Sequence, residues 1–395
     1  MSVLDAQQIG LRAEELAAEF LVCFQTEGNY LRDNINQLAE FAAYGDEVSV
    51  HAAGDAIFKR LVEPLADSFE PASVELYNRF FAQIVQFARG VEADLNRELS
   101  CFGLHDEEGI VRRVNSLRPA ASGRGKAVDP GSHRAAGGRV RLVIVLSRVT
   151  LGADVSVTSV IIERLKSAYP VADIVLTGGR KTSELFGGDR RLRFANLEYS
   201  RGGTLLERLM SWIDLLHEIG KLTHDLHSED VVIVDPDSRL TQLGVLPVAD
   251  ATGYFFFPSR EYSSANNASL GQLASHWSAS VFGGRGKIVP VVNPVLSDTE
   301  LGQRVVGLLG RHGRRPVVTV NFGVGENPRK RVGRDFEDSV VGSLIQKGFR
   351  VVLDRGAAEE ESMRIDSILA RVCGESSGVR VFDIDERNLS QAEGE

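Results

Sequence analysis

The sequence predicts an α/β protein in which two doubly wound units follow an all-helical N-terminal domain. Three observations lead to this prediction. Apolar residues recur at helical spacing over residues 10–115, a stretch rich in Gly, Pro and basic residues occupies 118–138, and short β-branched runs alternate with amphipathic segments from residue 139 onward. The first pattern is typical of packed helices, the second of an exposed connection, and the third of parallel sheets with helices on both faces.

Residues 1–117 are predicted to form the helical domain. Its apolar side chains recur every three or four positions, as in Leu11, Leu16, Phe20 and Phe24. The domain holds 9 basic and 20 acidic side chains, so that its formal charge of −11 exceeds the −9 of the whole chain. We expect an acidic outer face that recruits a protein partner.

Residues 118–138, with the sequence RPAASGRGKAVDPGSHRAAGG, are predicted to be a flexible linker. Apolar periodicity is absent from this stretch. Because it offers no apolar residues that could anchor one domain to the next, we expect a domain boundary here and a helical domain that folds independently.

Residues 139–296 are predicted to form a Rossmann-like unit. Strands are expected at 140–146, 173–177, 231–234 and 254–257, and helices at 156–169 and 205–226. A bridging helix is expected at 297–312, at the start of a second unit that runs to residue 395. In that unit we expect strands at 317–321, 349–353 and 379–382 and helices at 335–346 and 359–372. Three strands make this unit an incomplete nucleotide-binding domain, since a complete one has five or six.

Composition excludes several classes of function. The net charge of −9 argues against general binding of nucleic acid, and no apolar run reaches the length of a membrane span. Three widely separated cysteines indicate a reducing, cytoplasmic location without disulfides. Because no membrane span is predicted, any membrane contact is expected to be peripheral, at the inner face. The histidines at 217, 224 and 227 do not have the spacing of metal ligands, and no metal site is expected.

The turn after the first strand of the sheet is the first candidate site. Thr150, Gly152 and Asp154 follow the strand predicted at 140–146, and parallel strands present their carboxyl ends to a ligand. Asp154 is well placed as a general base. From spacing alone, the simpler interpretation is that Asp154 caps the helix that it precedes.

The second candidate site is the loop after the strand at 317–321. Gly323, Gly325 and Asn327 precede Lys330 within the sequence NFGVGENPRKR. Glycines admit close approach of a ligand to the backbone and the cations offset phosphate charge, so that the loop is a candidate diphosphate cradle. A solvated basic turn is an equally good interpretation of the residues alone. The acidic run 354–361, DRGAAEEE, either stabilises the start of its helix or contacts a ligand through Glu360.

Three segments of the chain resemble the family 9 glycosyltransferases, the heptosyltransferase kind. They are LVIVLSRVTLGADVSVTSVIIERLKSAYPVADIVLTGG, SELFGGDRRL and VVIVDPDSRLTQLG, and the resemblance extends over residues 139–385. It implies a GT-B-like architecture, with the acceptor bound by the unit at 139–296 and a nucleotide-sugar by the unit at 297–395. It also implies inverting, metal-independent transfer from a donor such as ADP-heptose to a cell-surface glycan or glycolipid acceptor, without a further cofactor.

The resemblance assigns roles to residues of both units. Asp154 matches the base that activates the acceptor hydroxyl, although the family's adjacent Gly-Asp pair is split here by Ala153. The segment VVIVDPDSRLTQLG, which contains Asp235, matches the family's fourth-strand region that lines the acceptor side. Lys330 matches the lysine placed against the donor diphosphate, and Glu360 the acidic residue that contacts the donor ribose or base.

One motif of the family is missing. Its later Asp-(Ser/Thr)-(Gly/Ala)-x-x-His segment, which contacts the donor, has no counterpart before the last residue, Glu395. The chain is therefore expected to be either a fragment of a longer protein or a degenerate relative. A non-catalytic glycan-binding or scaffold protein of the same family is the alternative to an enzyme.

Overall fold

The computed structural model describes residues 6–118, 140–200, 202–249, 253–262, 268–295, 316–324, 331–356, 359–373 and 382–383, together with residues 303 and 307. The chain divides into two compact units, Met1–Leu296 and Ser297–Glu395. This division coincides with the boundary predicted between residues 296 and 297. The predicted linker lies outside the described residues except for Arg118, and the predicted bridging helix except for residues 303 and 307.

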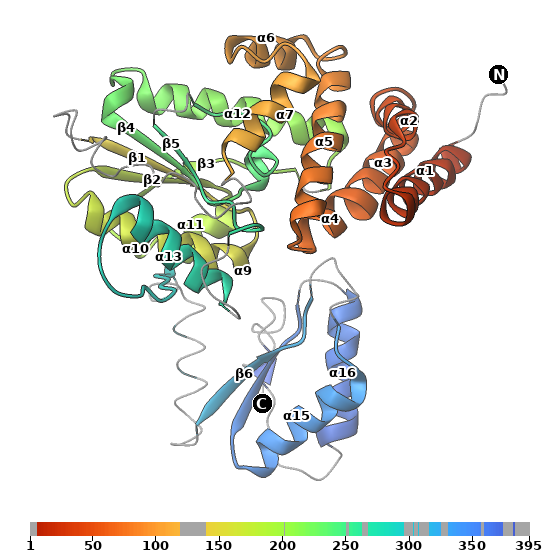
Figure 1. The fold of residues 1–395 in the computed structure, drawn as a ribbon. Helices are drawn as coiled ribbons and strands as arrows, with labels where there is room; N and C mark the ends of the chain where they lie inside the picture. Colours follow the sequence, from red (N-terminus) through yellow and green to blue (C-terminus); the bar gives the residue numbers. More distant parts are fainter. Residues whose placement is uncertain are drawn as a thin grey trace. The chain divides into compact units, whose positions relative to one another are not determined.

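The first unit begins with a helical segment, residues 6–118 (Figure 1). Its helices are α1 (Ala6–Glu27), α2 (Arg32–Ala43), α3 (Glu47–Asp55), α4 (Glu63–Asp67), α5 (Pro71–Ala88), α6 (Ala93–Cys101) and α7 (Glu107–Ser116), with a π-helical turn Ala56–Val62 between α3 and α4. Asp46 and Asp106 cap α3 and α7, because each carboxylate accepts a hydrogen bond from the N–H group three residues on.

A five-stranded parallel sheet follows, in the order β3-β2-β1-β4-β5. Its strands are β1 (Leu142–Leu146), β2 (Asp173–Gly178), β3 (Leu192–Asn196), β4 (Val231–Asp235) and β5 (Tyr254–Phe256). β1 is fully buried, as expected for the central strand of a sheet covered on both faces. The edge strand β3 was not predicted from the sequence, and only Leu192 and Ala195 in it are buried.

Helices cover both faces of this sheet. Those that follow β1 are α9 (Leu151–Ala153), a π-helical turn Asp154–Thr158 and α10 (Ser159–Ala168), and the others are α11 (Arg180–Phe186), α12 (Leu205–Thr223) and α13 (Leu270–Phe282). Residues of α10 and α13 pack with Val143 and Val145 on one face. On the other face, α12 and the helical segment pack with Leu142 and Ile144.

The helical segment shares its hydrophobic core with the sheet, which corrects the prediction of an independently folding domain. A single cluster of buried residues runs from α1 through α5 to β1 and α12. α5 explains the difference, because Leu76, Ala82 and Gln83 are buried in addition to the face that carries Tyr77 and Phe81, so that burial extends around most of the helix. A helix that is apolar nearly all round lies between two layers rather than on a surface.

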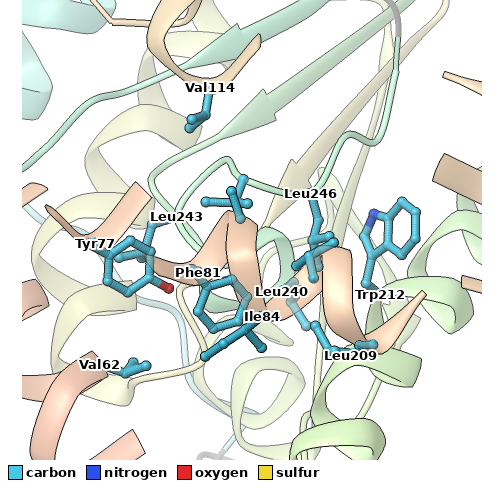
Figure 2. Packing of buried hydrophobic residues seen from close by; sticks show 14 of the residues in the cluster. Val62, Tyr77, Phe81, Ile84, Val114, Leu209, Trp212, Leu240, Leu243 and Leu246 are labelled. Carbon is cyan, nitrogen blue, oxygen red and sulfur yellow. The ribbon is translucent and has the colours of Figure 1, made fainter. Parts of the chain in front are cut away.

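Figure 2 shows this shared core at close range. Tyr77, Phe81 and Ile84 of the helical segment lie among residues of the sheet region. Their neighbours in the cluster are Leu209 and Trp212 of α12 and Leu240, Leu243 and Leu246 of the loop after β4. Helical segment and sheet therefore form one packing unit.

The second unit contains a three-stranded parallel sheet in the order β6-β7-β8. Its strands are β6 (Val317–Asn321), β7 (Arg350–Asp354) and β8 (Phe382–Asp383), and its helices are α15 (Arg334–Gln346) and α16 (Glu359–Cys373). Val341, Leu353 and Ile368 lie in its small separate core. The strands predicted at 317–321 and 349–353 and the helices predicted at 335–346 and 359–372 are present, and of the third predicted strand only residue 382 lies within the described residues.

Candidate functional site

The carboxyl edge of the first sheet is the place where its fold predicts a ligand. The strand order reverses direction between β1 and β4, and ligands of open α/β sheets bind in the crevice outside such a switch point. The turn at residues 147–150 follows β1, and the turn at residues 236–238 follows β4. The two turns are joined directly, because the Ser238 hydroxyl donates a hydrogen bond to the Ser147 carbonyl.

Asp154 lies beneath the turn after β1 and is only 2% exposed. One carboxylate oxygen accepts hydrogen bonds from the Arg148 backbone N–H (2.8 Å) and the Thr158 hydroxyl (2.7 Å), and the other accepts one from the Ser147 hydroxyl (2.6 Å). Burial raises the pKa of Asp154, although these hydrogen bonds and Arg148 act in the opposite direction. The carboxylate therefore holds the turn in shape and has a raised proton affinity.

The capping interpretation of Asp154 does not fit this geometry. Thr150 is the N-cap residue of α9, and Asp154 lies one turn inside the helical region. The turn itself is strained, because Val149, a β-branched residue, has a φ of +66°. Gly152 has no positive φ and a Cβ there would contact nothing, so that the fold does not require glycine at this position.

Asp235 is completely buried at the end of β4. Its carboxylate accepts hydrogen bonds from the Ser238 N–H (2.7 Å), the Thr241 hydroxyl (2.6 Å) and the Tyr254 hydroxyl (2.7 Å). Burial is the largest cause that raises the pKa of Asp235 to about 6. Asp235, which was predicted to line the acceptor side, thus stabilises the turn after β4 through hydrogen bonds.

Asp237, which no sequence pattern indicated, is a buried carboxylate at the carboxyl edge of the first sheet and is surrounded by arginines. It has a φ of +69°, is 1% exposed, and pairs with Arg260 at 2.6 Å. Burial alone would raise the pKa of Asp237, but Arg260 and Arg148 together hold it below its usual value. Arg148 is itself buried, and desolvation lowers its pKa to about 10.

The second unit has a shallow pocket at the carboxyl ends of β6 and β7. Only about 10 Å³ of it has room for the centre of a water molecule, and the rest is open to solvent. Two glycine turns border it: the Gly323 N–H donates to Asn321, and the Gly356 N–H donates to Asp354. Gly356 has a φ of +71°, and a side chain there would collide with the Glu361 carboxylate, so that glycine is required.

Three arginines, Arg331, Arg355 and Arg364, line the same pocket. Each already has an acidic partner: Arg331 pairs with Glu360, Arg355 with Asp366 (2.7 Å), and Arg364 with Glu337 (2.8 Å). The pocket lining therefore contains three arginines, each in an ion pair, together with the carboxylates of Asp354 and Glu361.

Of the five residues predicted for the donor site, only two are described. Gly323 lines the pocket, whereas Gly325, Asn327 and Lys330 lie outside the described residues. Glu360 is exposed and its pKa is lowered by the hydrogen bond from Arg331. The acidic residue on the pocket wall is its neighbour Glu361, which the sequence could not distinguish from Glu360 within a run of three glutamates.

Within the described ranges, no group of three or more His, Cys, Asp and Glu residues could hold a metal ion. None of the helices in those ranges is long and apolar enough to cross a membrane.

Comparison with protein-family models and with curated proteins gives no match. Among solved structures, part of the chain is similar to several glycosyltransferases. A family 9 glycosyl transferase from Veillonella parvula is 15% identical, with a TM-score of 0.44, over 62% of this chain and 69% of its own. ADP-heptose lps heptosyltransferase II of E. coli is 13% identical, with a TM-score of 0.40, over 64% of this chain and 75% of its own. E. coli heptosyltransferase WaaC with ADP is 11% identical, with a TM-score of 0.38, over 59% of this chain and 73% of its own. The likeness is partial and at the level of the fold.

Proposed function

We propose that this chain transfers a sugar, heptose, from a nucleoside diphosphate donor, ADP-heptose, to a glycan or glycolipid acceptor of the cell surface. The pocket at the carboxyl ends of β6 and β7 is the observation that carries the proposal. It combines two glycine turns with three arginines at the edge where parallel sheets bind nucleotides. Glycines admit phosphate oxygens close to the backbone, and arginine matches phosphate geometry in two hydrogen bonds.

The donor site that we propose extends beyond the pocket walls. Lys330 follows the Gly323 loop in sequence and would neutralise charge on the departing diphosphate. Glu361, packed against Gly323 and Gly356, offers a carboxylate to the ribose hydroxyls. This assignment moves the ribose contact from Glu360 to its neighbour, because Glu360 is engaged by Arg331.

Asp154 is the base in the proposed reaction. It accepts the proton of the acceptor hydroxyl while that oxygen bonds to the anomeric carbon of the sugar, the carbon–oxygen bond to the diphosphate breaks, and ADP leaves with the electron pair. A single displacement of this kind inverts the anomeric centre and needs no metal. The raised pKa of Asp154 suits a base. Because its oxygens are buried, the turn at residues 147–150 must move before an acceptor hydroxyl reaches it.

The same burial favours a second candidate function. A carboxylate that is 2% exposed and accepts two hydrogen bonds from the turn at residues 147–150 and one from Thr158 is also what a non-catalytic glycan-binding relative would keep for its structure. Such a protein would bind a nucleotide-sugar or glycan without turnover.

Titration of ADP-heptose into the wild-type chain and into Lys330→Ala tests the donor site. We expect Lys330→Ala to weaken binding about tenfold to a hundredfold, the loss typical of one charge-assisted hydrogen bond. Lys347→Ala is the matched control, since Lys347 is exposed at the end of α15 in the same unit. Equal affinities in all three proteins would remove Lys330 from the site. Absence of binding to the wild-type chain, with UDP-glucose and other nucleotide-sugars also tested, would overturn the proposed donor class.

A further inference from the structure

Buried hydrogen bonds connect the helical segment to the Asp237 carboxylate. Arg260 donates from Nε to the carbonyl oxygen of Ala66 in α4 (2.5 Å) and from Nη1 to Asp237 Oδ2 (2.6 Å). Arg260 is 7% exposed. One guanidinium therefore joins a helix near residue 66 to the turn after β4, although 194 positions separate Ala66 from Arg260 in the chain.

The same connection continues to the turn after β1. Asp237 Oδ2 also accepts a hydrogen bond from the Ser259 hydroxyl (2.7 Å), and that hydroxyl accepts one from Arg148 Nη1 (2.9 Å). Arg148 Nη1 also donates to the Pro236 carbonyl (2.8 Å), and the Arg148 backbone N–H donates to Asp154 (2.8 Å). A continuous path of buried polar contacts thus leads from Ala66 to Asp154.

The members of this path depend on one another. Asp237 faces Arg260 and Arg148, and Arg118 adds to their field. Its second oxygen, Oδ1, is buried and accepts no hydrogen bond from the described residues. Asp237 and Val149 both hold a positive φ, a conformation that persists only where surrounding contacts enforce it. Without the hydrogen bond to Ala66, the Arg260 guanidinium is no longer held against Asp237 and no longer stabilises its turn.

We propose that Arg260 is a positioning residue through which the helical segment fixes the turn that carries the contacts of Asp154. The proposal deepens the proposed function and rests on it for the role of Asp154 as a base. It gives the helical segment a part in the acceptor side of the protein, in addition to any surface that it offers to a partner. Arg260 itself touches no substrate and acts through Asp237, Ser259 and Arg148.

Hydrogen exchange of the whole chain tests this inference without an activity assay. In Arg260→Lys the positive charge near Asp237 is kept, but the two-pronged contact to Ala66 and Asp237 is lost. We expect amides of residues 147–158 to exchange about tenfold faster or more, the factor for one lost charge-assisted hydrogen bond, while amides of β2 change little. Arg191→Lys is the control, because the exposed Arg191 also donates to backbone carbonyls, at Pro170 and Tyr169.

A second variant covers the case in which Arg260→Lys does not fold. Ser259→Ala interrupts the path between Asp237 and Arg148 with a smaller change, and we expect faster exchange in the same residues. Folded variants with wild-type exchange at residues 147–158 would overturn the inference. Equal acceleration in β2 would also overturn it, since that result indicates only a general loss of stability.

Turnover separates failure of this inference from failure of the proposed function. If the wild-type chain transfers no sugar, the proposed function fails, and the exchange experiment still decides whether Arg260 positions the turn. If the wild-type chain is active, Arg260→Lys is expected to lower kcat more than it raises KM. The acid limb of the pH profile of kcat should also move to higher pH, because the pKa of Asp154 rises when Arg148 moves away. An unchanged profile in an active, folded variant contradicts the inference alone.

Discussion

Three carboxylates lie buried at the carboxyl ends of β1 and β4, and each is stabilised differently. Asp154 accepts hydrogen bonds from its own turn, Asp235 from two hydroxyls and one N–H group, and Asp237 pairs with an arginine. A charge buried without such partners would cost several kcal/mol. The direction of each pKa follows, since burial dominates at Asp154 and Asp235 and the arginines dominate at Asp237.

Asp235 gives a pH dependence of stability with a definite sign. Its pKa is about 6 in the folded chain, against an ordinary value of 3.8, so that the folded state keeps a proton which the unfolded state has lost. The stability that it contributes is fully present below about pH 4 and falls by about 3 kcal/mol as the pH rises past 6. We expect the destabilisation caused by Asp235→Asn to shrink by this amount between pH 4 and pH 7.

Urea unfolding followed by tryptophan fluorescence measures this difference. Both tryptophans of the chain, Trp212 and Trp277, are buried in the first unit and report on its unfolding. A difference in the free energy of unfolding between wild type and Asp235→Asn that stays constant from pH 4 to pH 7 would show that Asp235 has an ordinary pKa.

Position after a strand predicted that Asp154 lies at the carboxyl edge of the sheet, whereas Asp235 was assigned through the family resemblance. Their depth of burial was not predictable, because it depends on Tyr254 and Thr158 and on how the turns close over them. Asp237 and Arg260 are 23 positions apart, and no spacing rule brings them together. The ion pair exists only because β5 returns the chain to the end of β4.

Helix α5 joins the helical segment to the first sheet. Phe81 is fully buried within the core that the helical segment and the sheet share. We expect Phe81→Ala to lower the free energy of unfolding of the first unit by about 3–5 kcal/mol, the usual cost of such a cavity. The tryptophans should report the loss, although Phe81 belongs to the helical segment and both tryptophans follow it in the sheet region.

Leu11→Ala is the control for this prediction, since Leu11 is 62% exposed on α1 and should change stability by about 0.5 kcal/mol or less. If the urea midpoint from tryptophan fluorescence stayed at its wild-type value in Phe81→Ala while the helices unfolded separately, the helical segment and the sheet would unfold independently.

Elements with a strong apolar signal were predictable, and those with a mixed signal were not. Apolar runs located β1, β2, β4 and β5. The edge strand β3 carries exposed Arg193 within it, and α13 buries Ser275 and Ser278 against its neighbours, so that neither shows a clean apolar period. Their places are set by tertiary packing rather than by local pattern.

At the scale of the whole molecule, the helical segment belongs to the same compact unit as the first sheet. Arg113 and Arg118 donate to carbonyls of Gly244 and Leu243, which strengthens the apolar contact. The composition of residues 118–138 predicted a boundary in the chain, but it gave no information about the contacts between the helical segment and the sheet. Linker composition and domain independence are separate properties.

Residues 139–296 expressed without the helical segment are therefore expected not to fold. Removing residues 1–138 exposes the face of the sheet that packs with α5, including Leu142 and Ile144. We expect the fragment to aggregate or to lack a cooperative unfolding transition, whereas residues 1–296 alone unfold cooperatively. A soluble 139–296 fragment with a wild-type tryptophan transition would contradict the shared core.

Acceptor-dependent release of ADP from ADP-heptose is the measurement that decides whether the chain is a glycosyltransferase with Asp154 as its base. We expect the wild-type chain to release ADP faster when a truncated cell-surface glycan is present, and Asp154→Asn to lose about 10² to 10⁴ in rate, the contribution of a general base, with donor affinity unchanged. Donor binding without any acceptor-dependent release, or full activity in Asp154→Asn, would contradict the claim.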